Sequence, residues 1–149
     1  GFMIDLLRRL LAPTPAPLAE TDARLALAAL LVRVARTDGL YSAEEVERID
    51  RVLAFRHGLD AFAAARLRAE AESVEAEAPD TVRFTRALKE AVALDERSGL
   101  MTALWSVALA DGLREAHEDQ LLRLVANLLG LTDVESALAR QQAERAERE

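Results

Sequence analysis

The sequence predicts an all-α protein: a single compact bundle of about seven helices, preceded by a short N-terminal amphipathic helix. Alanine, leucine, arginine and glutamate dominate the 149 residues, whereas glycine and proline are few, and these four residue types lose little free energy on entering a helix. Apolar residues also recur at spacings of three and four along most of the chain, as on one face of a helix. Finally, one helical-hairpin pattern occurs twice, 73 residues apart. Together these observations predict two pseudo-symmetric hairpins within one bundle.

Residues 2–18 are expected to form the amphipathic helix and a linker. The segment Phe2 to Leu11 is apolar with two arginines and lacks the features of a secretory signal. Pro13, Pro15 and Pro17 follow, and alternating prolines favour a stiff, extended chain. The apolar side of so short a helix must be covered by its own domain, by a protein partner or by a membrane surface, and we expect them in that order.

The helical domain is expected over residues 19–140, and its first hairpin begins near Thr21. The first helix ends at Gly39. Ser42 and Glu45 then have the spacing of a capping box, in which each side chain accepts the other residue's backbone N–H. They open a second helix whose inward stripe is Val46, Ile49, Val52 and Leu53.

The middle of the domain predicts two further helices. Residues 60–77 are rich in alanine, glutamate and arginine and end before Pro79, so we expect this helix on the outside of the bundle. Residues 80–94 predict a helix that buries Phe84, Leu88 and Val92, followed by a break at Ser98 and Gly99.

The second hairpin is expected to start at Leu100, and its second helix to end at Gly130. Thr132 and Glu135 form another capping-box pattern, which opens a last helix. That helix is expected to fray into a polar tail over residues 141–149.

An Asp-Gly pair followed by a glutamate returns in both hairpins. Asp38 and Asp111 continue the inward stripes of their helices, and Glu45 and Glu118 lie seven residues further on, at the inner edges of the next helices. Packing demands repeated apolar residues but not repeated acids. If the hairpins pack as a pair, the four carboxylates converge, and such a cluster calls for a cation. The pattern predicts a site for a divalent cation, calcium or another hard metal, at Asp38, Glu45, Asp111 and Glu118.

A purely structural interpretation of the same acids is also open. Asp-Gly commonly ends helices, and Glu45 can serve only the capping box with Ser42. In the second copy position 115 is glutamate, so the capping box is lost although Glu118 remains. Neither copy is an EF-hand, because the first two ligand positions of such a loop are not occupied by oxygen ligands in either copy.

Composition and motifs exclude several functions. The net charge is −7, and the single lysine is Lys89, so no basic stripe suits nucleic acid. The absence of cysteine fits a reducing compartment, and we expect a cytoplasmic protein. The longest uncharged run has 13 residues, too few to span a membrane. No catalytic triad, phosphate loop or zinc motif occurs, and His57 and His117 are expected to be structural, so we expect no enzyme; a metal-dependent hydrolase is the third alternative.

The chain resembles the TerB-like domains, an all-helical family named after bacterial tellurite-resistance proteins, over about Leu25 to Ala139. The resemblance rests on the two Asp-Gly motifs with their glutamates and on the segment Arg83 to Leu88. It implies a compact seven-helix fold with internal pseudo-symmetry, an acidic metal site at the four residues above and no catalytic activity. It also implies a part in a stress-response complex, so a protein partner is expected; peripheral membrane association and the oligomeric state are left open. The alternative is a metal-free scaffold whose acids only cap helices.

Overall fold

The computed structural model describes residues 20–37, 39–78, 80–110 and 116–148, with side chains from residue 23 and, in the last range, from residue 119. Within these ranges the chain forms α-helices, one 3₁₀ helix and no strand, which confirms the predicted all-α class. The helix and linker predicted for residues 2–18 lie outside them. The elements are α2 (Glu20–Arg36), α3 (Ala43–His57), α4 (Ala61–Glu77), α5 (Val82–Ala91), η1 (Leu94–Glu96), α6 (Arg97–Ala108), α7 (Ala116–Leu128) and α8 (Asp133–Arg148).

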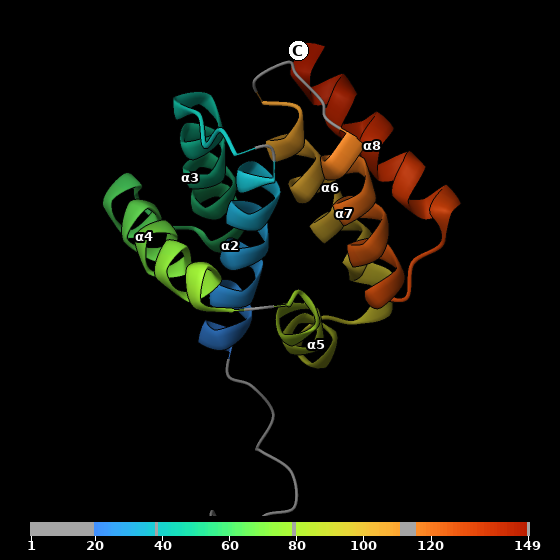
Figure 1. Ribbon diagram of the computed structural model, residues 1–149, viewed down its shortest axis with the longest axis horizontal. Helices are drawn as coiled ribbons and strands as arrows, with labels where there is room; N and C mark the ends of the chain where they lie inside the picture. The colour runs from blue at the N-terminus through green and yellow to red at the C-terminus, as the bar shows by residue number, and fades with distance from the viewer. Residues whose placement is uncertain (1–19, 38, 79, 111–115, 149) are drawn as a thin grey trace, which may run out of the picture.

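Helix α2 lies at the centre of the bundle. Its side chains from Ala26 to Ala35 are all buried except that of Arg33, because nearly every position in this stretch is alanine, leucine or valine. It contacts α3, α4, α5, α6 and α7. Figure 1 shows α3 and α4 on one side of α2, with α6, α7 and α8 on the other and α5 across the end where α2 begins. The core therefore forms around α2.

Helices α4 and α6 pack against α2 in two different ways. Helix α4 presents the fully buried Ala64 and Ala71, two small residues that let it approach α2 and α3 closely. Helix α6 instead contributes large buried side chains, among them Met101 and Leu104, and lies between α2 and α8. Figure 1 places α4 at the edge of the bundle, where the sequence predicted it.

Both predicted capping boxes are present. Ser42 Oγ accepts a hydrogen bond from the Glu45 N–H at 3.1 Å, and Glu45 Oε1 accepts one from the Ser42 N–H at 3.0 Å. Thr132 and Glu135 form the same pair of bonds at 3.1 and 3.0 Å. The starts of α3 and α8 are thus fixed by side chains that the sequence identifies.

The predicted break at Ser98 and Gly99 is wrong. Helix α5 already ends at Ala91, because Val92 is extended at φ −121° and ψ 124°. Helix α6 then starts at Arg97, so Gly99 lies in its first turn. A Cβ at Gly99 would lie 3.6 Å from the Arg56 guanidinium, which is an ordinary van der Waals contact. Gly99 therefore lies within a helix and marks no change of chain direction.

Arg97 holds this reversal of the chain together. Its guanidinium donates to the backbone carbonyls of Lys89 and Val92 at the end of α5 and of Leu129 after α7, at 3.0–3.1 Å. Carbonyls at helix ends have no partner within their own helix. One side chain therefore satisfies the ends of two helices.

The predicted fraying after residue 140 is also wrong, because α8 continues to Arg148. Ala143 is only 2% exposed, and Glu147 pairs with Arg48 of α3. Sequence pattern alone suggested a polar tail since alanine is the only apolar residue type in that stretch. In the structure one alanine suffices, because α8 lies close against α6.

Candidate functional site

The two helical hairpins turn at the same end of the bundle. Figure 1 shows the end of α2 and the start of α3 on the same side as the end of α6, the start of α7 and the end of α8. We call this end, which includes Arg36, Ser42 and Ser106, the hairpin end. The predicted pairing of the two turns requires this placement.

The first turn is fixed by local hydrogen bonds. Thr37 Oγ1 donates to the Arg33 carbonyl at 2.9 Å, and the Gly39 N–H donates to the Arg36 carbonyl at 3.0 Å. Gly39 has a φ of +81°, a conformation that glycine adopts without strain. The chain therefore leaves α2 in a defined direction and enters α3 at Ser42.

Glu45 lies in the core at the hairpin end. It is fully buried, and no other acidic or basic residue in the described ranges is classed as buried. The start of α3 offers it the positive end of the helix dipole, and the Ser42 N–H donates to one carboxylate oxygen. Burying a charged carboxylate still costs several kcal/mol unless it is compensated. In the core, where water screens little, the carboxylate of Glu45 interacts strongly with the groups around it.

The second capping box shows that capping alone does not require this burial. Glu135 makes the same hydrogen bonds as Glu45, at the same distances, yet it remains partly exposed. The difference lies in what surrounds the two carboxylates, since neighbouring residues cover Glu45 completely but leave Glu135 partly open to solvent. Glu45 therefore does more than a surface cap requires.

Arg48 connects the two hairpins near Glu45. It lies one turn further along α3 and donates to the carbonyl and the hydroxyl of Ser106 on α6, both at 3.0 Å. The same guanidinium pairs with Glu147 of α8. Ser106 lies five residues before Asp111. The start of α3 is thus tied to the helix that leads to the second Asp-Gly motif.

A second network ties α4 to the end of α2. Glu75 accepts hydrogen bonds from Arg33 at 3.0 Å and from Arg36 at 2.8 Å. Arg33 also donates to the Ala78 carbonyl at 2.7 Å and so satisfies the end of α4. The Arg36 guanidinium lies 5.1 Å from the centre of the Tyr41 ring. These contacts with α4 and Tyr41 stabilise the end of α2, where the first turn begins.

Tyr41 is partly buried within this network. Burial and the nearby Glu72 carboxylate raise the pKa of Tyr41 above its ordinary value of 10.0. Arg68 pairs with Glu72 at 3.2 Å and with Asp50 of α3 at 2.6 Å. The phenol therefore stays neutral throughout the physiological range.

The structure describes only part of the predicted acidic site. Glu45 lies at the hairpin end as expected, whereas Asp38, Asp111 and the side chain of Glu118 lie outside the described residues. The side chain of His117 and position 115 lie outside them as well. Within the described ranges, no three histidine, cysteine or acidic side chains form a group that could hold a metal ion. The four-carboxylate site therefore stays a prediction.

Sequence reasoning missed the arginines of α2 that bind Glu75 of α4. Arg33 is largely buried, although arginine is most often exposed, and both Arg33 and Arg36 bind Glu75. The sequence does contain a sign of this role, because both arginines lie within an otherwise apolar helix. Glu75, by contrast, belongs to an acidic run typical of a solvated face, and nothing in the sequence distinguishes it.

Comparison with protein families identifies one match. The family described as tellurite resistance protein TerB matches residues 24–141. The chain belongs to the TerB family. The matched part runs from Arg24 in α2 to Gln141 in α8 and contains both hairpins, so the resemblance seen in the sequence is confirmed. Neither the curated proteins nor the solved structures provide a match to this TerB chain.

The length and the apolar character of a helix decide whether it can cross a membrane. Within the described part of the chain, no helix combines the length and the apolar character needed to cross a membrane. The matched family describes a domain and does not itself specify a ligand or a partner.

Proposed function

We propose that this TerB domain is a non-enzymatic binding module that takes up a divalent cation and acts with a protein partner in a stress-response complex. The metal ligands are Asp38, Glu45, Asp111 and Glu118. The observation that carries the proposal is the burial of Glu45, which exceeds what its capping role requires. Little water screens a carboxylate in the core, so a cation bound beside Glu45 at the hairpin end would be held strongly.

The chemistry of these ligands sets the class of metal. All four are carboxylates, and sites built only from oxygen favour calcium, magnesium or manganese. Two ligands from each hairpin would make the metal a link between the halves of the bundle. The link by Arg48 from α3 to Ser106 supports such a shared site, since it ties the first hairpin to the end of α6.

Exposed apolar residues support a protein partner. Val134 and Leu138 lie one turn apart on α8 and are 69% and 57% exposed. Residues at this spacing share one face of a helix. We expect the partner, in the cytoplasm, to cover apolar side chains of this kind.

The alternative function is a metal-free helical scaffold, in which the acids only cap helices. It is favoured by the complete capping box at Ser42, which gives Glu45 a structural role without any metal. The two functions differ in one measurable property, the response of stability to metal ions.

Thermal unfolding of chelator-treated protein with and without calcium, magnesium, manganese or zinc tests the proposal. A ligand that binds only the folded state raises the free energy of unfolding by RT ln(1 + [L]/Kd), about 2.7 kcal/mol at a hundredfold excess over Kd. We expect a higher melting temperature with one hard cation. No change with any of these ions would leave the scaffold as the function.

Matched variants locate the effect. The Asp38→Asn, Asp111→Asn double variant should lose the calcium response, and so should Glu45→Gln. Glu135→Gln removes the same kind of capping carboxylate from α8 and should keep the response. A response that survives Glu45→Gln would place the metal elsewhere. Metal-dependent phosphatase or esterase turnover that is lost with Glu118→Gln would contradict the non-enzymatic role.

A further inference from the structure

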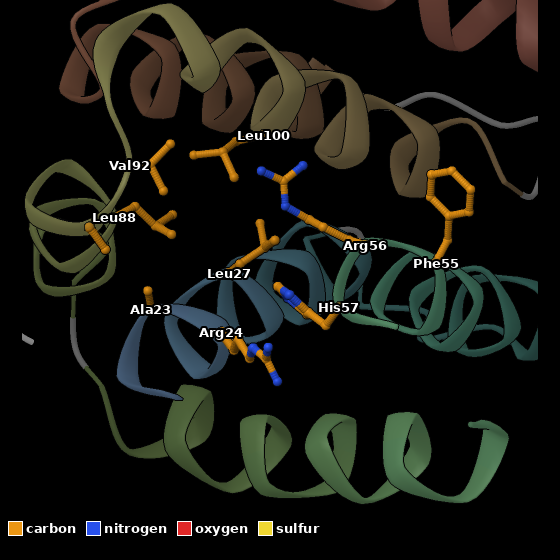
Figure 2. Close-up of a pocket in the computed structure, with 10 residues that line it drawn as sticks. Ala23, Arg24, Leu27, Phe55, Arg56, His57, Leu88, Val92 and Leu100 are labelled. Atoms are coloured by element: carbon orange, nitrogen blue, oxygen red, sulfur yellow. The ribbon is translucent and has the colours of Figure 1, made fainter. Parts of the chain in front are cut away.

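A cavity of about 730 Å³ lies at the other end of α3, away from Glu45. Its volume is within the range of small-molecule sites, about 300–1,000 Å³. The start of α2, the end of α3, the end of α5 and the first turns of α6 supply its walls. Figure 2 shows Leu27 between the helices, with Leu88, Val92 and Leu100 toward α5 and α6. Aliphatic side chains from three helices thus form one apolar wall.

The opposite part of the lining is basic. Arg24 comes from α2, and Arg56 and His57 from the last turn of α3. Figure 2 shows the Arg56 side chain reaching toward Leu100, while Arg24 and His57 lie on the other side of Leu27. Among the described residues that line this cavity none is acidic, although the chain as a whole carries a net charge of −7. The cavity therefore combines an apolar wall with a local excess of positive charge.

Arg56 differs from the arginines that hold the fold together. Arg33, Arg48 and Arg97 each donate to backbone carbonyls of other helices. Within the described ranges no hydrogen bond or ion pair holds the Arg56 guanidinium, which Glu96 attracts only from a distance. Arg56 is exposed as a whole residue, but the walls of the cavity desolvate its guanidinium in part and so lower the pKa of Arg56. A partly desolvated cation at a cavity wall can be compensated by an anion that enters the cavity.

We propose that this cavity binds an amphiphilic anion, a molecule with an apolar chain and a carboxylate or phosphate head. The chain lies against Leu27, Leu88 and Leu100. The head meets Arg56, whose planar guanidinium suits carboxylate and phosphate oxygens. Such a head is found on free amphiphiles and on membrane lipids, and the cavity accepts a single molecule of either kind.

Isothermal titration calorimetry of the 149-residue chain tests this proposal with decanoate and decyl phosphate, each below its critical micelle concentration. Decyltrimethylammonium has the same chain and a positive head. We expect the two anions to bind with one site per chain and the cation to bind at least tenfold more weakly. Equal binding of all three would overturn the proposal, because it would show that the charges of the cavity select nothing.

Three variants connect the binding to the cavity. Arg56→Gln should weaken decanoate binding about tenfold, which corresponds to the loss of one charge-assisted hydrogen bond. Arg51→Gln alters an exposed arginine on the same helix that does not line this cavity, and it should bind as the parent protein does. Ala91→Trp keeps all the charges but fills the cavity from an exposed position, so it should abolish binding.

Binding to vesicles of phosphatidylglycerol distinguishes a membrane lipid from a free amphiphile as the source of the head group. Binding of decanoate with the expected response to Arg56→Gln supports the cavity whether or not vesicles also bind. Binding to vesicles without any binding of decanoate or decyl phosphate would contradict it, because a charged surface would then be the ligand. Unchanged affinity in Arg56→Gln or Ala91→Trp would also overturn it. None of these results depends on a metal at the hairpin end.

Discussion

Single side chains at the hairpin end show how environment, not residue type, sets their role. Glu45 and Glu135 make identical capping bonds, yet only Glu45 is buried. Tyr41 is likewise an ordinary turn residue in sequence, but burial and the Glu72 carboxylate disfavour its charged form. The pH at which Tyr41 loses its proton therefore reports whether the network around the first turn is intact.

The titration of Tyr41 yields a prediction for alkaline solution. The chain has one tyrosine, so tyrosinate absorbance reports this residue alone. We expect Tyr41 to ionise above its ordinary pKa of 10.0 in the folded protein and near that value when unfolded. Because the folded state holds the proton more tightly, this contribution to stability is complete below pH 10 and decreases as the pH rises above it.

Tyr41→Phe is the control, since it cannot ionise. Its free energy of unfolding should decrease less than that of the parent protein between neutral and strongly alkaline pH. Ionisation of Tyr41 at the same pH in folded and unfolded protein would show that the ring is not desolvated.

The sequence predicts the residues of the caps more completely than those of the networks. Ser42 and Glu45 are three positions apart, and such local spacing is sufficient to identify their bonds. The bonds of Glu75 to Arg33 and Arg36 join positions about 40 residues apart, and only the packing of α4 on α2 brings them together. The inward orientation of Glu45 was predicted, but its complete burial depends on tertiary packing, which local spacing does not specify.

At the scale of elements, the lengths of the helices depend on their neighbours. Helix α8 has a low content of large apolar residues after residue 140, which is why the sequence predicted its end there. Its last turns persist because Ala143 packs in the interior and Glu147 reaches Arg48. Conversely, α5 ends earlier than its apolar pattern predicts, because Val92 leaves the helical conformation before η1.

Two aspartate substitutions test whether the end of α8 belongs to the core. Ala143→Asp places a carboxylate at a position that is 2% exposed and should lower the free energy of unfolding by about 2–4 kcal/mol. Ala146→Asp, one turn further at an exposed position, should change it by no more than about 0.5 kcal/mol. Urea unfolding measures both. Equal effects would mean that the end of α8 is a solvated tail after all.

For the whole molecule, the central position of α2 makes the two hairpins interdependent. Helix α2 packs against the helices of both hairpins, and Arg48 adds a bond from α3 to α6 and one to α8. The all-α class and the paired hairpins could be predicted because the apolar pattern repeats along the chain. The identity of the central helix could not, since α2 and α6 are both apolar and only the packing distinguishes them.

This interdependence predicts a single cooperative unfolding transition. Trp105, the one tryptophan, is 6% exposed on α6 and donates to Ser136 of α8 at 3.4 Å. Its fluorescence therefore reports the α6–α8 side, whereas far-ultraviolet circular dichroism reports all helices. The two midpoints in urea should coincide, as for most domains of this size. A fluorescence midpoint that differs from the dichroism midpoint would show that the halves unfold separately.

The bonds of Arg97 have a consequence for how this chain can change during evolution. Its three acceptors are main-chain carbonyls, of Lys89, Val92 and Leu129. Every amino acid carries such a carbonyl, so a mutation at Lys89 leaves its bond to Arg97 in place. Arg97 itself cannot be replaced in this way, because lysine does not have the planar set of N–H donors of a guanidinium. Drift among relatives should therefore be slow at Arg97 and faster at Lys89, the exposed one of the three positions that it binds. Arginine supplies all but one of the 19 basic residues of this chain.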